Sequence, residues 1–88
     1  MRKIIFTTQF KRDVKLAEKR RKDVSKLLDV FRLLAADEVL PERYKDHSLG
    51  GNWKYHRDLH IEPDWLLIYR QDAEDVVMVR TGTHSDLF

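Results

Sequence analysis

The spacing of the apolar residues changes near residue 52, and this change constrains the fold more than any other feature of the chain. Before it, apolar side chains recur at helical spacing, as at Phe10, Val14 and Ala17. After it, side chains alternate as in a β-strand from Trp53 to Ile61. A helical period followed by a strand period predicts helices first and strands afterwards, so we expect an α+β domain.

The expected elements follow one another in the order β-α-α-β-β-β. Thr7 or Thr8 can cap a first helix, which ends at the basic run of residues 19–22. A second helix begins near Asp23, and two amphipathic helices so close in sequence are expected to fold back as a hairpin. Strands are expected at residues 4–6, 53–61, 65–70 and 76–81.

The late strands have short connections, with Pro63 in the first of them, and therefore predict an antiparallel meander that forms a curved sheet. The helix hairpin must cover one face of this sheet, because the strands have no other place to bury their apolar side. The opposite face is then free for chemistry. Residues 37–52 are expected to be an irregular loop, and a loop this long is usually functional.

Length and composition indicate a single domain, residues 1–88, in a reducing compartment. So short a chain buries roughly 60% of its unfolded surface, which leaves a thin core. The chain has no cysteine, which excludes disulfides and thiolate chemistry. We see no signal peptide and no apolar run near the roughly 20 residues of a membrane span, so a cytoplasmic location is expected.

The charge of the chain is divided unevenly along its length. Residues 1–36 have a balance of +7 and residues 37–88 a balance of −5. The first part is therefore a candidate surface for a polyanion, although a solvated pair of helices explains the same lysines. The candidate side chains for contact with RNA are Lys15, Lys19, Arg20, Arg21, Lys22, Lys26 and Lys54.

All four histidines lie in the second half of the chain, at His47, His56, His60 and His84. Imidazole changes its charge near neutral pH, so several of them can give and take protons around a phosphate. His60 and Asp64 flank a bend, and Asp64 could orient His60 or act as a base itself. The alternative is that Asp64 is a turn residue and His60 an exposed strand residue.

Arg80 and His84 form the second candidate group. Arg80 ends a buried strand, where its guanidinium suits a phosphate. The alternative is an internal salt bridge, for example to Asp58 or Asp64. His84 follows on a short tail, and a meander can bring it beside His60.

A metal site competes for the same side chains. His60, Asp64 and His84 could in principle bind zinc, but they lack the tight spacing of zinc ligands. His56 and His60 lie about 13 Å apart on an extended chain and cannot share an ion. We expect neither a metal nor a cofactor.

Three segments carry a resemblance to a known family: LPERYKDHSLGGNWK, RDLHIEPDWLLIY and RTGTHSDLF. Together they resemble the YafQ branch of the RelE/ParE toxin superfamily, the toxins of bacterial type II toxin–antitoxin pairs. The resemblance implies a ribosome-dependent mRNA endonuclease that a cognate antitoxin protein holds inactive. The sequence departs from the family's pattern at Tyr55, His56 and Leu59, so the resemblance implies no role for His56.

The site that the resemblance implies comprises His47, His60, Asp64, Arg80, His84 and Phe88. RNA supplies its own nucleophile, the 2′-hydroxyl, so a base, a cation and an acid suffice. We expect His84 to be the general acid, with His60 and Asp64 on the base side, although these labels can be exchanged. Arg80 would bind the phosphate, His47 would assist charge stabilisation, and Phe88 would stack on or brace a base.

The sequence leaves two other functions open. One is a ParE-like toxin that acts on gyrase; such proteins lack this histidine set. The other is a non-catalytic module that binds RNA or a protein partner.

Overall fold

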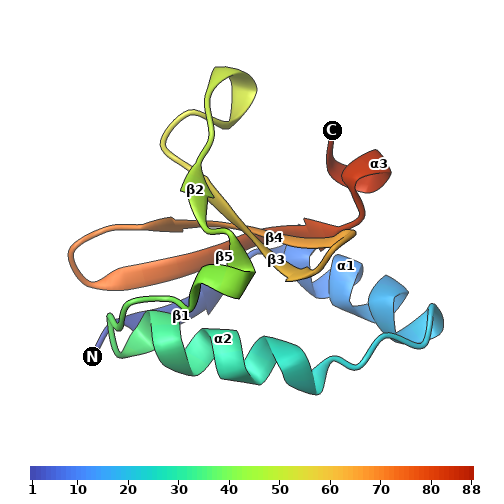
Figure 1. Ribbon diagram of the computed structural model, residues 1–88, viewed down its shortest axis with the longest axis horizontal. Coiled ribbons are helices and arrows are strands. Elements are labelled where there is room, and N and C mark those ends of the chain that lie inside the picture. Colours follow the sequence, from blue (N-terminus) through green and yellow to red (C-terminus); the bar gives the residue numbers. More distant parts are fainter.

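The computed structural model describes residues 1–88 and shows a curved five-stranded sheet with two long helices on one face (Figure 1). The elements are β1 (Lys3–Phe6), α1 (Thr8–Lys19), α2 (Ser25–Ala35), β2 (His47–Ser48), β3 (Arg57–Glu62), β4 (Trp65–Gln71), β5 (Asp75–Gly82) and α3 (His84–Leu87). Two 3₁₀ turns, Glu42–Tyr44 and Gly51–Trp53, flank β2. The expected α+β class is confirmed, and the six expected elements follow in the expected order, but the chain adds β2 and α3 to them. The helices are too short or too polar to span a membrane.

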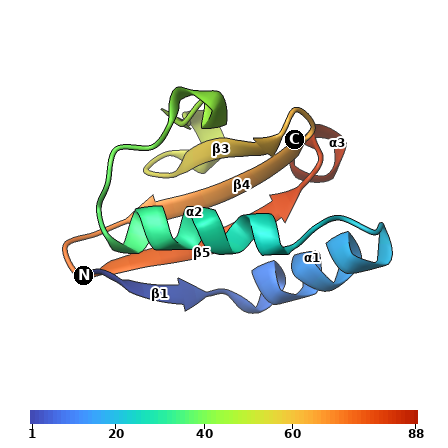
Figure 2. The same cartoon turned by 60° about the horizontal axis from the view of Figure 1, so that its bottom comes forward.

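The two long helices form the expected hairpin over the sheet. Thr7 caps α1, since its hydroxyl oxygen accepts a hydrogen bond from the backbone N–H of Phe10 at 2.9 Å. Figure 2 shows α2 lying across the sheet, with α1 beyond its end. Both helices bury one apolar face against the strands, and the resulting core comprises Phe10, Ala17, Leu27, Val30, Leu34, Tyr44, Leu59, Trp65, Leu67, Tyr69, Val76 and Met78.

The strands lie in the order β1-β5-β4-β3-β2. Strands β2 to β5 pair antiparallel, so the meander is confirmed. Strand β1 instead pairs parallel to β5, from Lys3 opposite Asp75 to Phe6 opposite Met78, so the sheet is not wholly antiparallel. The direction of this pair depends on where the chain returns after the helix hairpin and the meander, and the short run at residues 4–6 carries no signal for it.

The strand expected at 53–61 begins later, and this part of the prediction was wrong. Trp53 belongs to a 3₁₀ turn, and Tyr55 has a φ of 71°, a left-handed conformation that a strand does not allow. The edge of β3 is taken instead by β2, a strand that we did not expect. As a result, His47 lies directly opposite Asp58 in the sheet.

The pairing register separates the two faces of the sheet. Leu59 of β3 points into the core under the helices, so its neighbours Asp58 and His60 point to the opposite face. On that face, Leu66 and Ile68 form a small second cluster, to which α3 contributes a leucine. Figure 1 shows β2 and α3 rising from the sheet on the side away from α2. The open face therefore carries the candidate site.

Candidate active site

His84 is paired with Asp64 at one end of the open face. A carboxylate oxygen of Asp64 accepts a hydrogen bond from the backbone N–H of His84 at 2.9 Å and lies 2.6 Å from its Nδ1. These hydrogen bonds from His84, the backbone one first, lower the pKa of Asp64. Because an ionised carboxylate only accepts, Nδ1 of His84 carries a proton and Nε2 is left for a substrate.

His60 lies beside His84, with 5.7 Å between the ring centroids. Its Nδ1 is buried and has no hydrogen-bond partner. The bend at Pro63 therefore does not pair Asp64 with His60, as the sequence suggested, because Asp64 turns to the His84 side chain 20 residues further along the chain. The structure nevertheless brings His60, Asp64 and His84 together on one patch.

His47 is paired with Asp58 in the neighbouring strands. Nδ1 of His47 lies 2.9 Å from the carbonyl oxygen of Lys45 and 3.0 Å from a carboxylate oxygen of Asp58. The carbonyl oxygen of Lys45 accepts a hydrogen bond, so Nδ1 carries the proton and Nε2 is again free. The same carboxylate oxygen of Asp58 has no hydrogen-bond partner, so its contact with His47 is an ion pair when the imidazole is charged. Asp58 is only 4% exposed, and this burial raises the pKa of its carboxyl. The nearby imidazoles, His47 most strongly, act to lower the same pKa.

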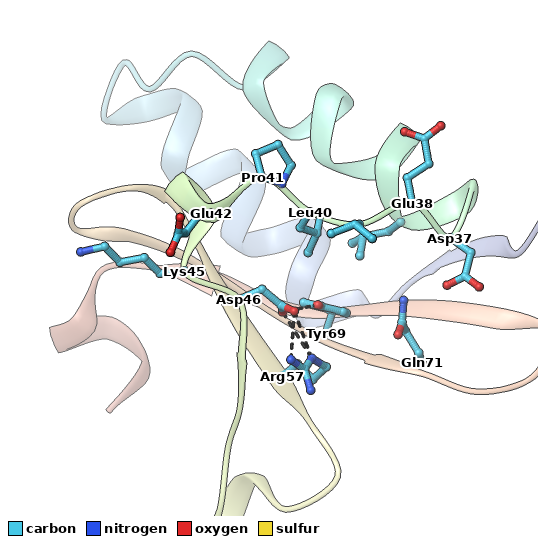
Figure 3. A pocket seen from close by; sticks show the side chains of 12 residues that line it. Asp37, Glu38, Leu40, Pro41, Glu42, Lys45, Asp46, Arg57, Tyr69 and Gln71 are labelled. Atoms are coloured by element: carbon cyan, nitrogen blue, oxygen red, sulfur yellow. Dashed lines mark hydrogen bonds and ion pairs between the residues drawn. The ribbon is translucent and has the colours of Figure 1, made fainter.

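A polar network anchors the loop just before His47 (Figure 3). Asp46 accepts a hydrogen bond from the hydroxyl of Tyr69 and another from Nη2 of Arg57 at 2.9 Å. Burial is the main cause that raises the pKa of Tyr69, so this hydroxyl remains a donor at neutral pH. A pocket of about 410 Å³ lies beside this network, under the loop. The network fixes the start of β2 and hence the position of His47.

Arg80 is held by Asp13 of α1. Its Nε and Nη2 donate to the two carboxylate oxygens at 2.8 and 3.2 Å, and the backbone N–H of Thr81 donates to the same carboxylate at 3.1 Å. The internal salt bridge that was our alternative for Arg80 is therefore present, but its partner is neither Asp58 nor Asp64. These bonds leave Nη1 without a partner in the protein, and the side chain is 28% exposed.

Asp13 is a residue that sequence reasoning missed. It is 7% exposed, although an unpaired carboxylate is almost never buried. A signal was available, because Asp13 lies three residues after Phe10 and four before Ala17, on the apolar face of the helix. A carboxylate at such a position predicts a buried partner, but not which one.

Some of the candidate cations for RNA already have carboxylate partners. Arg20 pairs with Asp86, and both Lys22 and Lys26 pair with Glu62. The remaining candidates make no ion pair with the protein; they are Lys15, Lys19, Arg21 and Lys54. Phe88 is 60% exposed at the end of α3, where its ring is accessible. No group of three or more histidine and carboxylate side chains is arranged to hold a metal ion.

Two imidazoles, each fixed by an acceptor, lie on the open face of the sheet, so the structure is that of a small α+β protein with a candidate acid–base site. Within that class, this chain belongs to the family described as "Bacterial toxin of type II toxin-antitoxin system, YafQ", whose model matches residues 2–88. The resemblance seen in the sequence is confirmed.

Individual relatives agree with this family. The chain is 49% identical over 88 residues to the mRNA interferase toxin YafQ of Escherichia coli strain K12, covering 99% of this chain and 96% of the relative. The crystal structure of YafQ from E. coli strain BL21(DE3) superposes with a TM-score of 0.94 at 47% identity, covering 100% and 99% of the two chains. The toxin in the E. coli DinJ–YafQ complex superposes with a TM-score of 0.92 at 48% identity, with the same coverage.

Proposed function

We propose that this chain is an endoribonuclease toxin that cleaves mRNA on the ribosome by metal-independent attack of the 2′-hydroxyl. The observation that carries the proposal is the pair of imidazoles, His47 and His84, each held at Nδ1 by acceptors so that Nε2 is free. The relative named an mRNA interferase toxin, at 49% identity, supports the same activity.

The reaction needs one base and one acid on opposite sides of a phosphate. The base takes the proton of the 2′-hydroxyl as that oxygen bonds to phosphorus, and the bond from phosphorus to the 5′-oxygen breaks. The acid gives a proton to the departing 5′-oxygen. The products are a 2′,3′-cyclic phosphate and a 5′-hydroxyl, and no other reactant enters.

The geometry favours His84 as the acid and His47 as the base. Asp64 orients His84, so it does not serve as the base that we expected from sequence. The carboxylate of Asp58 lies 3.0 Å from Nδ1 of His47 and would stabilise a protonated imidazole, which gives His47 a larger role than charge stabilisation. His60, whose ring lies beside that of His84, would stabilise the charge that develops on the phosphate.

Arg80 and Phe88 would bind the substrate around these imidazoles. Asp13 occupies two donors of Arg80 and so fixes its guanidinium, which leaves the remaining donors for the phosphate. The exposed ring of Phe88 would stack on or brace a base, since every base has a face for stacking.

The partners follow from the same proposal. The E. coli relative has been crystallised as a DinJ–YafQ toxin–antitoxin complex, and we infer a cognate antitoxin for this chain. The unpaired cations of the helices and of the loop at Lys54 would hold ribosomal RNA, and the protein would act in the cytoplasm, where ribosomes are. The match to the YafQ family argues against a gyrase-directed toxin.

Cleavage of mRNA on programmed ribosomes should persist when transition metals are removed, because the 2′-hydroxyl mechanism needs no ion. The measurement uses a chelator that removes zinc and copper but leaves the Mg²⁺ that ribosomes require. A gyrase-directed toxin or a non-catalytic module would leave the message intact with or without chelator. Loss of cleavage with the chelator, restored by added zinc, would overturn the mechanism.

Replacing Asp58 with asparagine should slow cleavage without destabilising the fold. The carboxylate no longer braces His47, and small misplacements of a reacting group cost about 10–10²-fold in rate. Burial raises the pKa of Asp58, so its charge costs folding free energy at neutral pH. The cost disappears as the pH falls below the ordinary value of 3.8, where the carboxyl is protonated in both states.

Thermal unfolding and single-turnover cleavage of Asp58→Asn test this directly. At pH 7 the variant should melt at the same temperature as the native protein or higher, and this advantage should shrink toward pH 4. An unchanged cleavage rate would show that Asp58 does not support His47. A lower melting temperature would show that its charge stabilises the fold after all.

A further inference from the structure

The short helix α3, which carries His84, is closed on itself by Asp86. The backbone N–H of Thr83 donates to a carboxylate oxygen of Asp86 at 2.9 Å, and the backbone N–H of Asp86 donates to the hydroxyl of Thr83 at 3.1 Å. This is a capping box, in which the two residues satisfy each other's backbone groups. A helix of four residues has no stability of its own, so its orientation depends on contacts with the rest of the protein.

Arg20 binds the same carboxylate from the end of α1. Its Nη1 donates to Oδ2 of Asp86 at 2.6 Å, and its Nη2 donates to Oδ1 at 3.3 Å. The hydrogen bond from Arg20 is the first cause of a lowered pKa for Asp86, so the pair is ionised throughout the neutral range. A two-point guanidinium–carboxylate pair fixes direction as well as distance.

Gly82 lets Asp86 fold back toward the sheet. A Cβ atom at Gly82 would lie 2.9 Å from both Cβ and Oδ2 of Asp86, closer than such atoms approach. On the other side of α3, Leu87 is buried against Leu66 and Ile68. Helix α3 thus packs on an apolar cluster through Leu87, and Arg20 binds its acidic side chain, Asp86.

We propose that Arg20 and Asp86 form a clamp that positions His84 for catalysis. Asp64 can orient the imidazole only where α3 presents His84 to it. The Leu87 contact and the hydrogen bond from the backbone N–H of His84 to Asp64 hold α3 on the sheet, and the ion pair adds a third restraint by tying α3 to α1. Arg20 then acts through His84, and its role is distinct from the ribosome binding that the basic run suggested. This inference rests on the proposed function of the site.

The clamp can be tested with variants that keep size and shape. Asp86→Asn retains an oxygen for the capping box but loses the ionic partner of Arg20, and Arg20→Gln removes the guanidinium. Arg12→Gln is the matched control, since Arg12 is an exposed arginine on the same helix that makes no ion pair. Rates are measured in single turnover at saturating ribosomes, where differences in ribosome affinity no longer matter.

Both clamp variants should cleave about 10-fold more slowly at saturation, because a reacting group displaced by a fraction of an ångström loses rate steeply. The double variant should be no slower than either single one, and Arg12→Gln should match the native rate. An Arg20→Gln variant that needs more ribosomes but reaches the native rate would overturn the proposal, since Arg20 would then act in binding alone.

A second readout does not depend on cleavage. The imidazole ¹⁵N and ¹H signals of His84 report its hydrogen bond to Asp64 in the free protein. Asp86→Asn and Arg20→Gln should shift both signals in the same direction, with the melting temperature recorded for each variant. Unchanged His84 signals in a folded variant would overturn the clamp. If the native protein failed to cleave RNA while these shifts appeared, the proposed function would fall and the positioning contact would stand.

Discussion

Replacing His84 with alanine is expected to lower the single-turnover rate of mRNA cleavage by about 10²–10⁴-fold, the range that a general acid contributes. In the proposed mechanism, the imidazole held by Asp64 protonates the departing 5′-oxygen. Ribosome affinity should change little, because the unpaired cations lie on other elements. The measurement pairs cleavage on programmed ribosomes with co-sedimentation of the protein and ribosomes.

His56→Ala is the matched control for this experiment. Nδ1 of His56 is hydrogen-bonded to the carbonyl oxygen of Lys54. His56 takes no part in the imidazole–carboxylate pairs of His47 and His84. Its replacement should leave cleavage at the native rate. If His84→Ala cleaved normally, or failed only because it no longer bound ribosomes, His84 would not be the acid, and His47 or His60 would have to take its place.

Replacing the four unpaired cations with alanine should have the reverse effect, weakening ribosome binding while sparing the chemical step. The variant combines Lys15→Ala, Lys19→Ala, Arg21→Ala and Lys54→Ala. Each cation that contacts a phosphate contributes roughly 0.7–0.9 to the slope of log affinity against log salt. The loss of four such contacts should flatten the slope by about 3, with the cleavage rate at saturation preserved.

A double variant provides the control for loss of charge alone. Arg32 and Arg70 each pair with a nearby aspartate and lie outside the candidate surface. Arg32→Ala combined with Arg70→Ala should leave the salt slope nearly unchanged. Co-sedimentation across a series of salt concentrations measures both variants. An unchanged slope for the four-cation variant would place ribosome binding on another surface.

The features that could be predicted from the sequence are those that local patterns encode. The change of apolar spacing predicts the helix hairpin and the late strands, and Thr7 caps α1 as expected. The prediction was wrong where a local pattern competed with a distant partner. Trp53 and Tyr55 alternate like strand residues, yet β3 begins only at Arg57. Its first residues pair with β2, a partner that the local pattern does not reveal.

The candidate site shows the same division. Residue type and position singled out His60, Asp64 and His84, and the family resemblance added His47; the sheet and α3 bring these four to one face. The pairings among them could not be predicted, because they join residues distant in sequence. Asp64 reaches His84 across 20 residues, and Asp13 reaches Arg80 across 67. Such pairs depend on the register of the sheet and on the path of α1, which no local pattern specifies.

The most direct test of the mechanism replaces one 2′-hydroxyl in the message. The cleavage site is first mapped on an unmodified mRNA on programmed ribosomes, and the nucleotide on its 5′ side is then changed to the 2′-deoxy form. The mechanism predicts that cleavage at that bond disappears, and that the unmodified message yields ends with a 2′,3′-cyclic phosphate and a 5′-hydroxyl. Cleavage of the 2′-deoxy message at the native rate, with a 5′-phosphate on the product, would contradict it.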